Sequence, residues 1–399
     1  MSKAPQVTVE GPLKGVRILD LTRLYPGPLA TMLAAQMGAE VIKIEDPHKP
    51  DPMRHYPPFV DGQSAGYLAV NAHKKSLGLK LRSEEGKTLF LDLAKKADVL
   101  VEGFRPGVME SAGLGYETLK DVNPRIIYLS ITGYGQTGPY ANEPGHDLNY
   151  IGYAGILGAT GNQKTGIIAP GHQPADVAGG AYMALNACLS ALYAREKTGV
   201  GQYVDVAMLD GVLPLMSLQL AHQWAIEKPP KRGELLLSGG TACYDVYRCA
   251  CGGYMALGAL EPKFWSAFCD MVKRPDWVNR QFDTGQAGEE LKRLLQQLFL
   301  ERSRDEWLSI SQGRELCLTP VWELDEVEKD PQLQARGMVV TDRLGRKTLG
   351  CPIKFSDTPT GQHSNPAPQP GAHTEDILKE LGLSKEQLAR LREKGIVKG

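Results

Sequence analysis

A histidine and an aspartate stand side by side in the stretch Gly145–Tyr150 (GHDLNY), directly after a loop rich in glycine and proline. Histidine is the side chain whose ordinary pKa lies closest to neutral pH, so His146 is a candidate general base. The alternative is structural, because Asp147 or His146 could cap the helix that the following apolar run predicts. The hexapeptide alone favours neither interpretation.

The strands and helices predicted around this stretch alternate, which is typical of an open, largely parallel sheet with helices on both faces. Short β-branched runs predict strands at 15–22, 40–45, 76–81, 98–102, 125–132 and 203–208. Leucine- and alanine-rich runs predict helices at 29–37, 84–96 and 179–196, the first beginning only after Pro26-Gly27-Pro28. The loop 133–144 follows a strand, and ligands of such sheets bind at the carboxyl ends of strands. The first strand is not followed by GxGxxG, which argues against dinucleotide redox chemistry.

The chain of 399 residues is long enough for two or three domains. We expect an α/β fold with a Rossmann-like large domain over residues 1–226 and a small α+β domain over 227–337, entered through a proline-rich linker at 228–233. In the small domain we predict a hairpin of two strands followed by helices. Residues 338–399 are expected to return to the large domain.

Composition narrows the class of partner. A formal net charge of -1 gives no indication of a nucleic-acid partner, so an anionic ligand would need a local basic pocket. The seven cysteines are scattered without metal-ligand spacing, which favours reduced thiols and predicts no metal. We find neither an apolar signal core nor a run approaching about 20 apolar residues, so we expect a cytoplasmic protein without a membrane partner.

Four long stretches resemble the class III CoA-transferase superfamily, also called CaiB/BaiF-like. They are 20–47 (DLTRLYPGPLATMLAAQMGAEVIKIEDP), 101–115 (VEGFRPGVMESAGLG), 123–139 (NPRIIYLSITGYGQTGP) and 198–211 (TGVGQYVDVAMLDG). Three others are similar to its α-methylacyl-CoA racemase branch: 145–157 (GHDLNYIGYAGIL), 174–185 (PADVAGGAYMAL) and 254–265 (YMALGALEPKFW). The sequence departs from that branch at Asp46, where racemases often carry a basic residue and transferases do not.

The resemblance implies a catalytic set of His146, Asp176 and Glu261. His146 and Asp176 would serve opposite faces of the carbon next to a thioester, and Glu261 would orient the imidazole. Each acid has a structural alternative, since Asp176 could be a helix N-cap and Glu261 a first-turn acid before Pro262. We expect Asp176 to lie before a helix whose first N–H groups could face the enolate oxygen. His172 is a rival base that no matching motif supports.

Coenzyme A, as part of the substrate, would need cations for its phosphates. Its expected binding residues in the matching stretches are Arg23, Lys43, Lys74, Lys75, Arg105, Gly145, Asp147 and Tyr150. Arg105 is the first choice among the cations, whereas Asp147 is expected chiefly to be a structural neighbour of His146. His73 is expected either near the phosphates or in solvent. The resemblance also implies an interlocked homodimer and no cofactor other than the substrate's own coenzyme A.

Three functions remain open at this level. The first is an acyl-CoA racemase or epimerase for 2-methyl-branched or other 2-substituted acyl-CoA. The second is a CoA-transferase in which Asp176 attacks the thioester and forms an anhydride. The third is a CoA-binding protein without activity.

Overall fold

The computed structural model describes residues 10–226, 231–360 and 365–399, and the start of the predicted linker, 228–230, lies outside them. These residues form two compact units. Unit 1 comprises 10–154, 171–215, 332–360 and 365–399, and unit 2 comprises 155–170, 216–226 and 231–331. Residues 155–170 and 216–226 therefore belong with unit 2, in contrast to the predicted large domain of residues 1–226.

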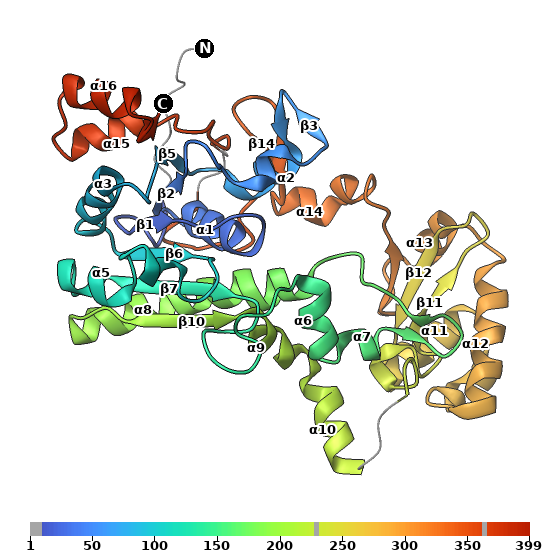
Figure 1. The fold of residues 1–399 in the computed structure, drawn as a ribbon. Helices are drawn as coiled ribbons and strands as arrows, with labels where there is room; N and C mark the ends of the chain where they lie inside the picture. Colours follow the sequence, from blue (N-terminus) through green and yellow to red (C-terminus); the bar gives the residue numbers. More distant parts are fainter. Residues whose placement is uncertain (1–9, 227–230, 361–364) are drawn as a thin grey trace. The chain divides into compact units, whose positions relative to one another are not determined.

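Unit 1 is organised around a seven-stranded sheet in the order β10-β7-β6-β1-β2-β5-β16 (Figure 1). Its strands are β1 (Arg17–Asp20), β2 (Glu40–Glu45), β5 (Lys75–Leu79), β6 (Val99–Glu102), β7 (Ile127–Thr132), β10 (Tyr203–Ala207) and β16 (Val397–Lys398). Six strands are parallel, and only β16, from the end of the chain, joins the edge antiparallel. The six parallel strands follow the doubly wound order, which reverses direction between β1 and β6 and opens a ligand crevice there.

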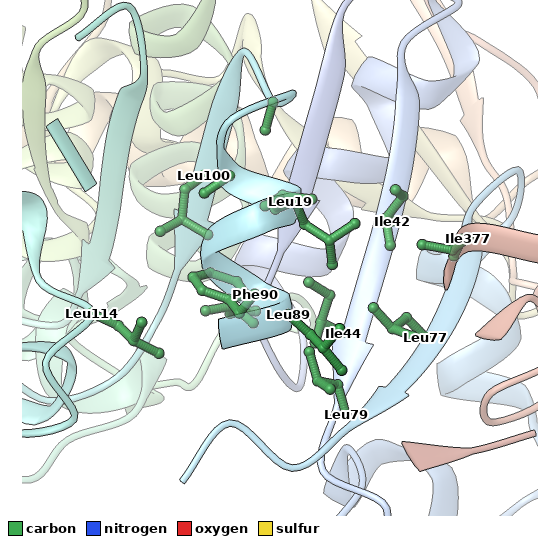
Figure 2. Close-up of a cluster of buried hydrophobic side chains, with 14 of the residues drawn as sticks. Leu19, Ile42, Ile44, Leu77, Leu79, Leu89, Phe90, Leu100, Leu114 and Ile377 are labelled. Atoms are coloured by element: carbon green, nitrogen blue, oxygen red, sulfur yellow. The ribbon is translucent and has the colours of Figure 1, made fainter. Parts of the chain in front are cut away.

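Helices cover both faces of this sheet. They are α1 (Pro26–Gln36), α2 (Ala65–Asn71), α3 (Glu84–Ala94), α4 (Val108–Ser111), α5 (Tyr116–Val122), α6 (Asp147–Tyr153), α8 (Met183–Thr198), α9 (Met208–Val212), α15 (Thr374–Glu380) and α16 (Lys385–Glu393). Leu19 of β1 and Leu100 of β6 pack beside Phe90 of α3 on one face (Figure 2). Their neighbours Ile18 and Val101 point to the other face, toward α1 and α8. Adjacent residues on one strand are thus buried on opposite faces, which explains why the strands read as continuous apolar runs.

Two helix starts differ from their prediction. Helix α1 begins at Pro26. Proline is well tolerated at the first helical position, because the N–H group that it lacks would have no hydrogen-bond partner there. The helix expected from Gly179 begins instead at Ala175, with a π-helical stretch η2 (Ala175–Tyr182) that continues into α8. Residues 175–198 are also long and apolar enough to cross a membrane, unlike any run that we expected. They contact α1, α9, β7 and β10 of unit 1.

Unit 2 contains a three-stranded antiparallel sheet of β11 (Tyr244–Arg248), β12 (Tyr254–Gly258) and β13 (Leu318–Val321), the last of which was not predicted. Its main helices are α10 (Ser217–Ile226), α11 (Pro262–Met271), α12 (Gly285–Phe299) and α13 (Arg304–Ser311). Trp265, Trp277 and Trp307 are all buried in its core. The aromatic ring of Phe299 stacks on Tyr247 with 5.0 Å between ring centroids.

Candidate active site

A pocket of about 580 Å³ lies in unit 1 where the chain leaves β1, β6 and β7. Its walls come from the loops at 22–27, 103–106 and 131–134, and from residues 141–150. Of the predicted site residues, those that line it are Arg23, Arg105, Gly145, His146, Tyr150 and Asp176. This is the crevice where the sheet order reverses, so the topology itself brings these loops together.

His146 is the residue from which α6 begins. Its backbone N–H donates to Asn149 Oδ1 at 3.0 Å, and its side chain is exposed at the pocket wall. The Tyr150 hydroxyl donates to the Gly145 carbonyl at 2.6 Å, which closes the turn before His146. The helix-start interpretation of this stretch is therefore confirmed for the backbone, and His146 at this position lines the pocket.

Asp147 fixes the neighbouring helix and is nearly buried. Its Oδ2 accepts the backbone N–H groups of Ala175 at 2.6 Å and of Asp176 at 3.0 Å, so it caps the start of η2. The expected structural role is confirmed, and the expected contact of Asp147 with substrate is wrong because the residue is nearly buried and is absent from the pocket lining. We expected the first N–H groups of this helix to face the enolate oxygen. This prediction is wrong, because Asp147 accepts the N–H groups of Ala175 and Asp176. The next one, of Val177, donates to the Gln173 carbonyl.

Asp176 sits in the first turn of η2, half-buried in the pocket wall. Burial raises the pKa of its carboxyl group to about 6, and the charge of Asp147 raises it further, while His146 acts in the opposite direction. A carboxyl group with this pKa exchanges protons readily near neutral pH, which suits an acid–base role. Asp176 is not an N-cap, since Pro174 holds that position.

Two glycines allow η2 to approach its neighbours. A Cβ atom at Gly179 would lie 2.3 Å from the carbonyl oxygen of Met208, and one at Gly180 would lie 2.8 Å from Cβ of Pro26. A side chain at either position would push η2 away from α9 or α1. The π-helical turns are a local distortion of a kind common at functional sites, and here they carry Asp176.

Arginine supplies the cations of the pocket. Arg23 and Arg105 are both exposed in its lining, and the Arg23 guanidinium lies over the ring of Phe104 at 5.1 Å from the centroid. Sequence reasoning missed Phe104, although its place beside Arg105 was a signal. A planar guanidinium held on a ring is well suited to bind phosphate with two hydrogen bonds.

The predicted phosphate contacts of Lys43 and Lys74 are wrong, because both ammonium groups are fully buried. Lys74 Nζ forms an ion pair with Asp20 at 2.9 Å, and Lys43 Nζ forms one with Asp51 at 3.0 Å. Burial also lowers the pKa of Lys74 to about 8, against the attraction of Asp20. These lysines neutralise acids beneath the loop that follows β1.

Lys75 does not line the pocket either. It is the first residue of β5 and pairs with Glu40, the first residue of β2. Both are at the amino ends of their strands, whereas the pocket is at the carboxyl ends, so its predicted phosphate contact is wrong. His73 lines a separate hollow of about 450 Å³, where burial lowers its pKa to about 4.

Glu261 belongs to unit 2. It holds the N-cap position of α11 ahead of Pro262, and its side chain is exposed and makes no capping hydrogen bond. Its carboxylate therefore makes no hydrogen bond to the start of α11, although a structural role at this helix start was the alternative to catalysis. His172 is exposed and absent from the pocket lining. Within the described ranges, no group of three or more His, Cys, Asp or Glu residues could hold a metal ion.

Comparison with known proteins gives a consistent family. The model of CoA-transferase family III matches residues 13–374. An acyl-CoA transferase of Fusarium pseudograminearum is 34% identical over 97% of this chain and 89% of its own. The α-methylacyl-CoA racemase of Homo sapiens is 32% identical over 96% of this chain and 97% of its own. The crystal structure of a CaiB/BaiF family protein from Brucella suis superposes with a TM-score of 0.82 at 32% identity, covering 93% of this chain and all of that one.

Proposed function

Because the chain belongs to CoA-transferase family III, we propose that it is an acyl-CoA racemase or epimerase for 2-methyl-branched or other 2-substituted acyl-CoA. The observation that supports this choice is the presence of His146 and Asp176 in the wall of one pocket, with the pKa of Asp176 raised to about 6. A histidine imidazole and a carboxyl group whose pKa is raised to about 6 are a suitable pair for moving a proton at carbon.

In the proposed reaction, one of the two groups takes the proton from C2 of the thioester. The electron pair of the broken C–H bond moves onto the thioester oxygen and gives an enolate. The other group then returns a proton to the opposite face of C2, so the configuration is inverted and no atom is lost. His146 serves one face and Asp176 the other, and the roles exchange in the reverse direction.

Three further residues complete the proposal. Arg23 and Arg105 bind the phosphates of coenzyme A at the outer wall of the pocket. Glu261 is the third member of the catalytic set in this proposal, and its replacement by glutamine is expected to slow proton exchange with little change in affinity for coenzyme A. We propose that the working unit is a homodimer.

A CoA-transferase is the second candidate, favoured by the identity to the Fusarium transferase and by Asp46 after β2. In that reaction, the Asp176 carboxylate attacks the thioester carbonyl and the C–S bond breaks. The products are a mixed anhydride of Asp176 with the donor acyl group and the thiolate of coenzyme A. The acceptor carboxylate then attacks the Asp176 carbonyl of this anhydride and displaces the donor acid, which leaves a second anhydride of Asp176 with the acceptor. The thiolate attacks the acceptor carbonyl of the second anhydride, which gives the new acyl-CoA and regenerates the Asp176 carboxylate.

The deciding experiment is hydrogen–deuterium exchange at C2 of a small panel of 2-methylacyl-CoA esters in D₂O, without any acceptor acid. Wild-type protein is expected to exchange C2 hydrogen, and His146→Ala to lose exchange by at least about 100-fold, as for removal of a general base. His172→Ala is the matched control, since this exposed histidine is outside the pocket, and it should retain exchange.

Retained exchange in His146→Ala would overturn the assignment. Transfer of coenzyme A to a free acid, abolished in Asp176→Asn, would establish the second candidate. Coenzyme A binding with neither reaction would show a binding protein instead.

A further inference from the structure

A buried acid, Glu102, lies at the start of the pocket loop that carries Arg105. Glu102, the last residue of β6, is only 5% exposed. Among residues 10–226, 231–360 and 365–399, no lysine or arginine forms an ion pair with it, and the charges of two acids, Glu110 and Asp205, act on its pKa. Burial raises the pKa of Glu102 to about 7, with a smaller contribution from these two acids. Such a group is costly to bury, so its polar contacts call for an explanation.

One oxygen of Glu102 binds the backbone of the loop after β6, which carries Phe104 and Arg105. Its Oε2 accepts the backbone N–H of Phe104 at 2.7 Å. The ring of Phe104 carries the guanidinium of Arg23, and the next residue is Arg105. The position of Phe104 therefore determines where both pocket arginines can reach.

The other oxygen of Glu102 connects this loop to the next one. Its Oε1 accepts the hydroxyl of Ser130 on β7, and the Ser130 oxygen in turn accepts Nε2 of Gln136 at 2.8 Å. Gln136 lies in the loop that leads to His146. Glu102, Ser130 and Gln136, which we call the Glu102 brace, thus join the loops after two adjacent strands.

We propose that Glu102 is a positioning residue, which holds the Phe104–Arg105 loop so that Arg23 and Arg105 stay directed at the phosphates of coenzyme A. This inference rests on the proposed function in taking coenzyme A as the ligand. It assigns Glu102 no contact with substrate and no part in the proton transfer.

The two loops depend on the brace to different degrees. The loop after β7 has other anchors, since Gly135 N donates to Thr132 Oγ1 at 3.0 Å and Gln136 N to Asp205 Oδ2 at 2.9 Å. The start of the loop after β6 is held by Glu102 through Phe104. Loss of the carboxyl group should therefore weaken binding of coenzyme A much more than it slows proton exchange.

The test measures two quantities for each variant: affinity for coenzyme A itself by calorimetry, and kcat and KM for C2 exchange. Glu102→Ala is expected to bind coenzyme A about tenfold more weakly, as for one lost hydrogen bond to a charged group, with kcat within about threefold of wild type. Glu102→Gln keeps an acceptor for the Phe104 N–H and should restore affinity to within about threefold.

Glu102→Asp provides an independent arm if the alanine variant does not fold. It keeps the acid but is one methylene shorter, so it loses reach to Phe104 and should weaken coenzyme A binding as alanine does. Unchanged affinity in a folded Glu102→Ala or Glu102→Asp variant, or a fall in kcat alone, would overturn the proposal. Wild-type protein that binds coenzyme A without C2 exchange would overturn the racemase assignment, and the affinities of the Glu102 variants would still decide whether Glu102 is a positioning residue. Wild-type protein that fails to bind coenzyme A would overturn both.

Discussion

Asp176 should destabilise the folded protein at neutral pH, and its replacement by asparagine should reveal by how much. Its pKa is raised from 3.8 to about 6, chiefly because burial disfavours the charged carboxylate. In an acid with a raised pKa, the folded state binds the proton more tightly than the unfolded state. The stability that this proton contributes is full below about pH 4, is lost as the pH rises through about 6, and stays lost above it.

The magnitude follows from the difference in pKa. A rise from 3.8 to about 6 corresponds to about 3 kcal/mol, and solvent screening of this partly exposed group reduces it to about 1.5 kcal/mol. Asp176→Asn is similar in size and carries no charge. The free energy of unfolding of this variant, relative to wild type, should therefore rise by about 1 to 1.5 kcal/mol between pH 4 and pH 7.5.

The assay is urea unfolding followed by circular dichroism at pH 4, 5.5 and 7.5, with equal m values as the condition for comparison. Asp176→Ala is the matched control. It should show the same pH trend from a lower overall stability, because it also lacks the charge but leaves space in the pocket wall. Parallel stability curves for Asp176→Asn and wild type would refute the reasoning, since they would show that folding does not perturb this carboxyl group.

Two further predictions concern charges around the pocket. Asp147→Asn should lower the pKa of Asp176, because a negative charge next to it is removed. The acidic limb of the pH–rate profile should then move to lower pH, and an unchanged limb would show that Asp147 does not influence the pKa of Asp176. Lys74→Met should lower the free energy of unfolding, measured in urea, by about 3 to 5 kcal/mol, because it leaves the Asp20 carboxylate buried without its lysine. Lys95→Met, which breaks an exposed ion pair, should lower it by at most about 1 kcal/mol. Equal losses of stability in the two variants would show that burial of the Lys74–Asp20 pair does not matter.

Local sequence determined the elements of the sheet. The range 40–45 was predicted to the residue, and the strands at β6 and β7 were predicted within two residues at each end. These strands are buried on both faces, so apolar and β-branched residues predominate in them and the pattern is strong, although β2 also carries Glu40, Lys43 and Glu45. The helix starts were predicted less well, because proline at the first position of α1 and the π-helical turns of η2 depend on what packs against them.

The candidate site divides in the same way. Residue types and sequence motifs identified His146, Asp176 and Arg105 as candidates. These residues line one pocket although they are far apart in the chain. Sequence ranked Arg105 first among the cations but could not exclude Lys43, because both are basic residues in the matching stretches. Only the tertiary structure decides that Lys43 points inward to Asp51.

What the sequence by itself determined is the chemistry available: an imidazole, a carboxyl group and arginines at loops that follow parallel strands. What only the tertiary structure decided is the state of each group. Burial and neighbouring charge set the pKa of Asp176, turn Asp147 into a helix cap and place Glu102 behind the arginine loop. These properties depend on distances between segments that are remote in the chain, and no local pattern of residues encodes them.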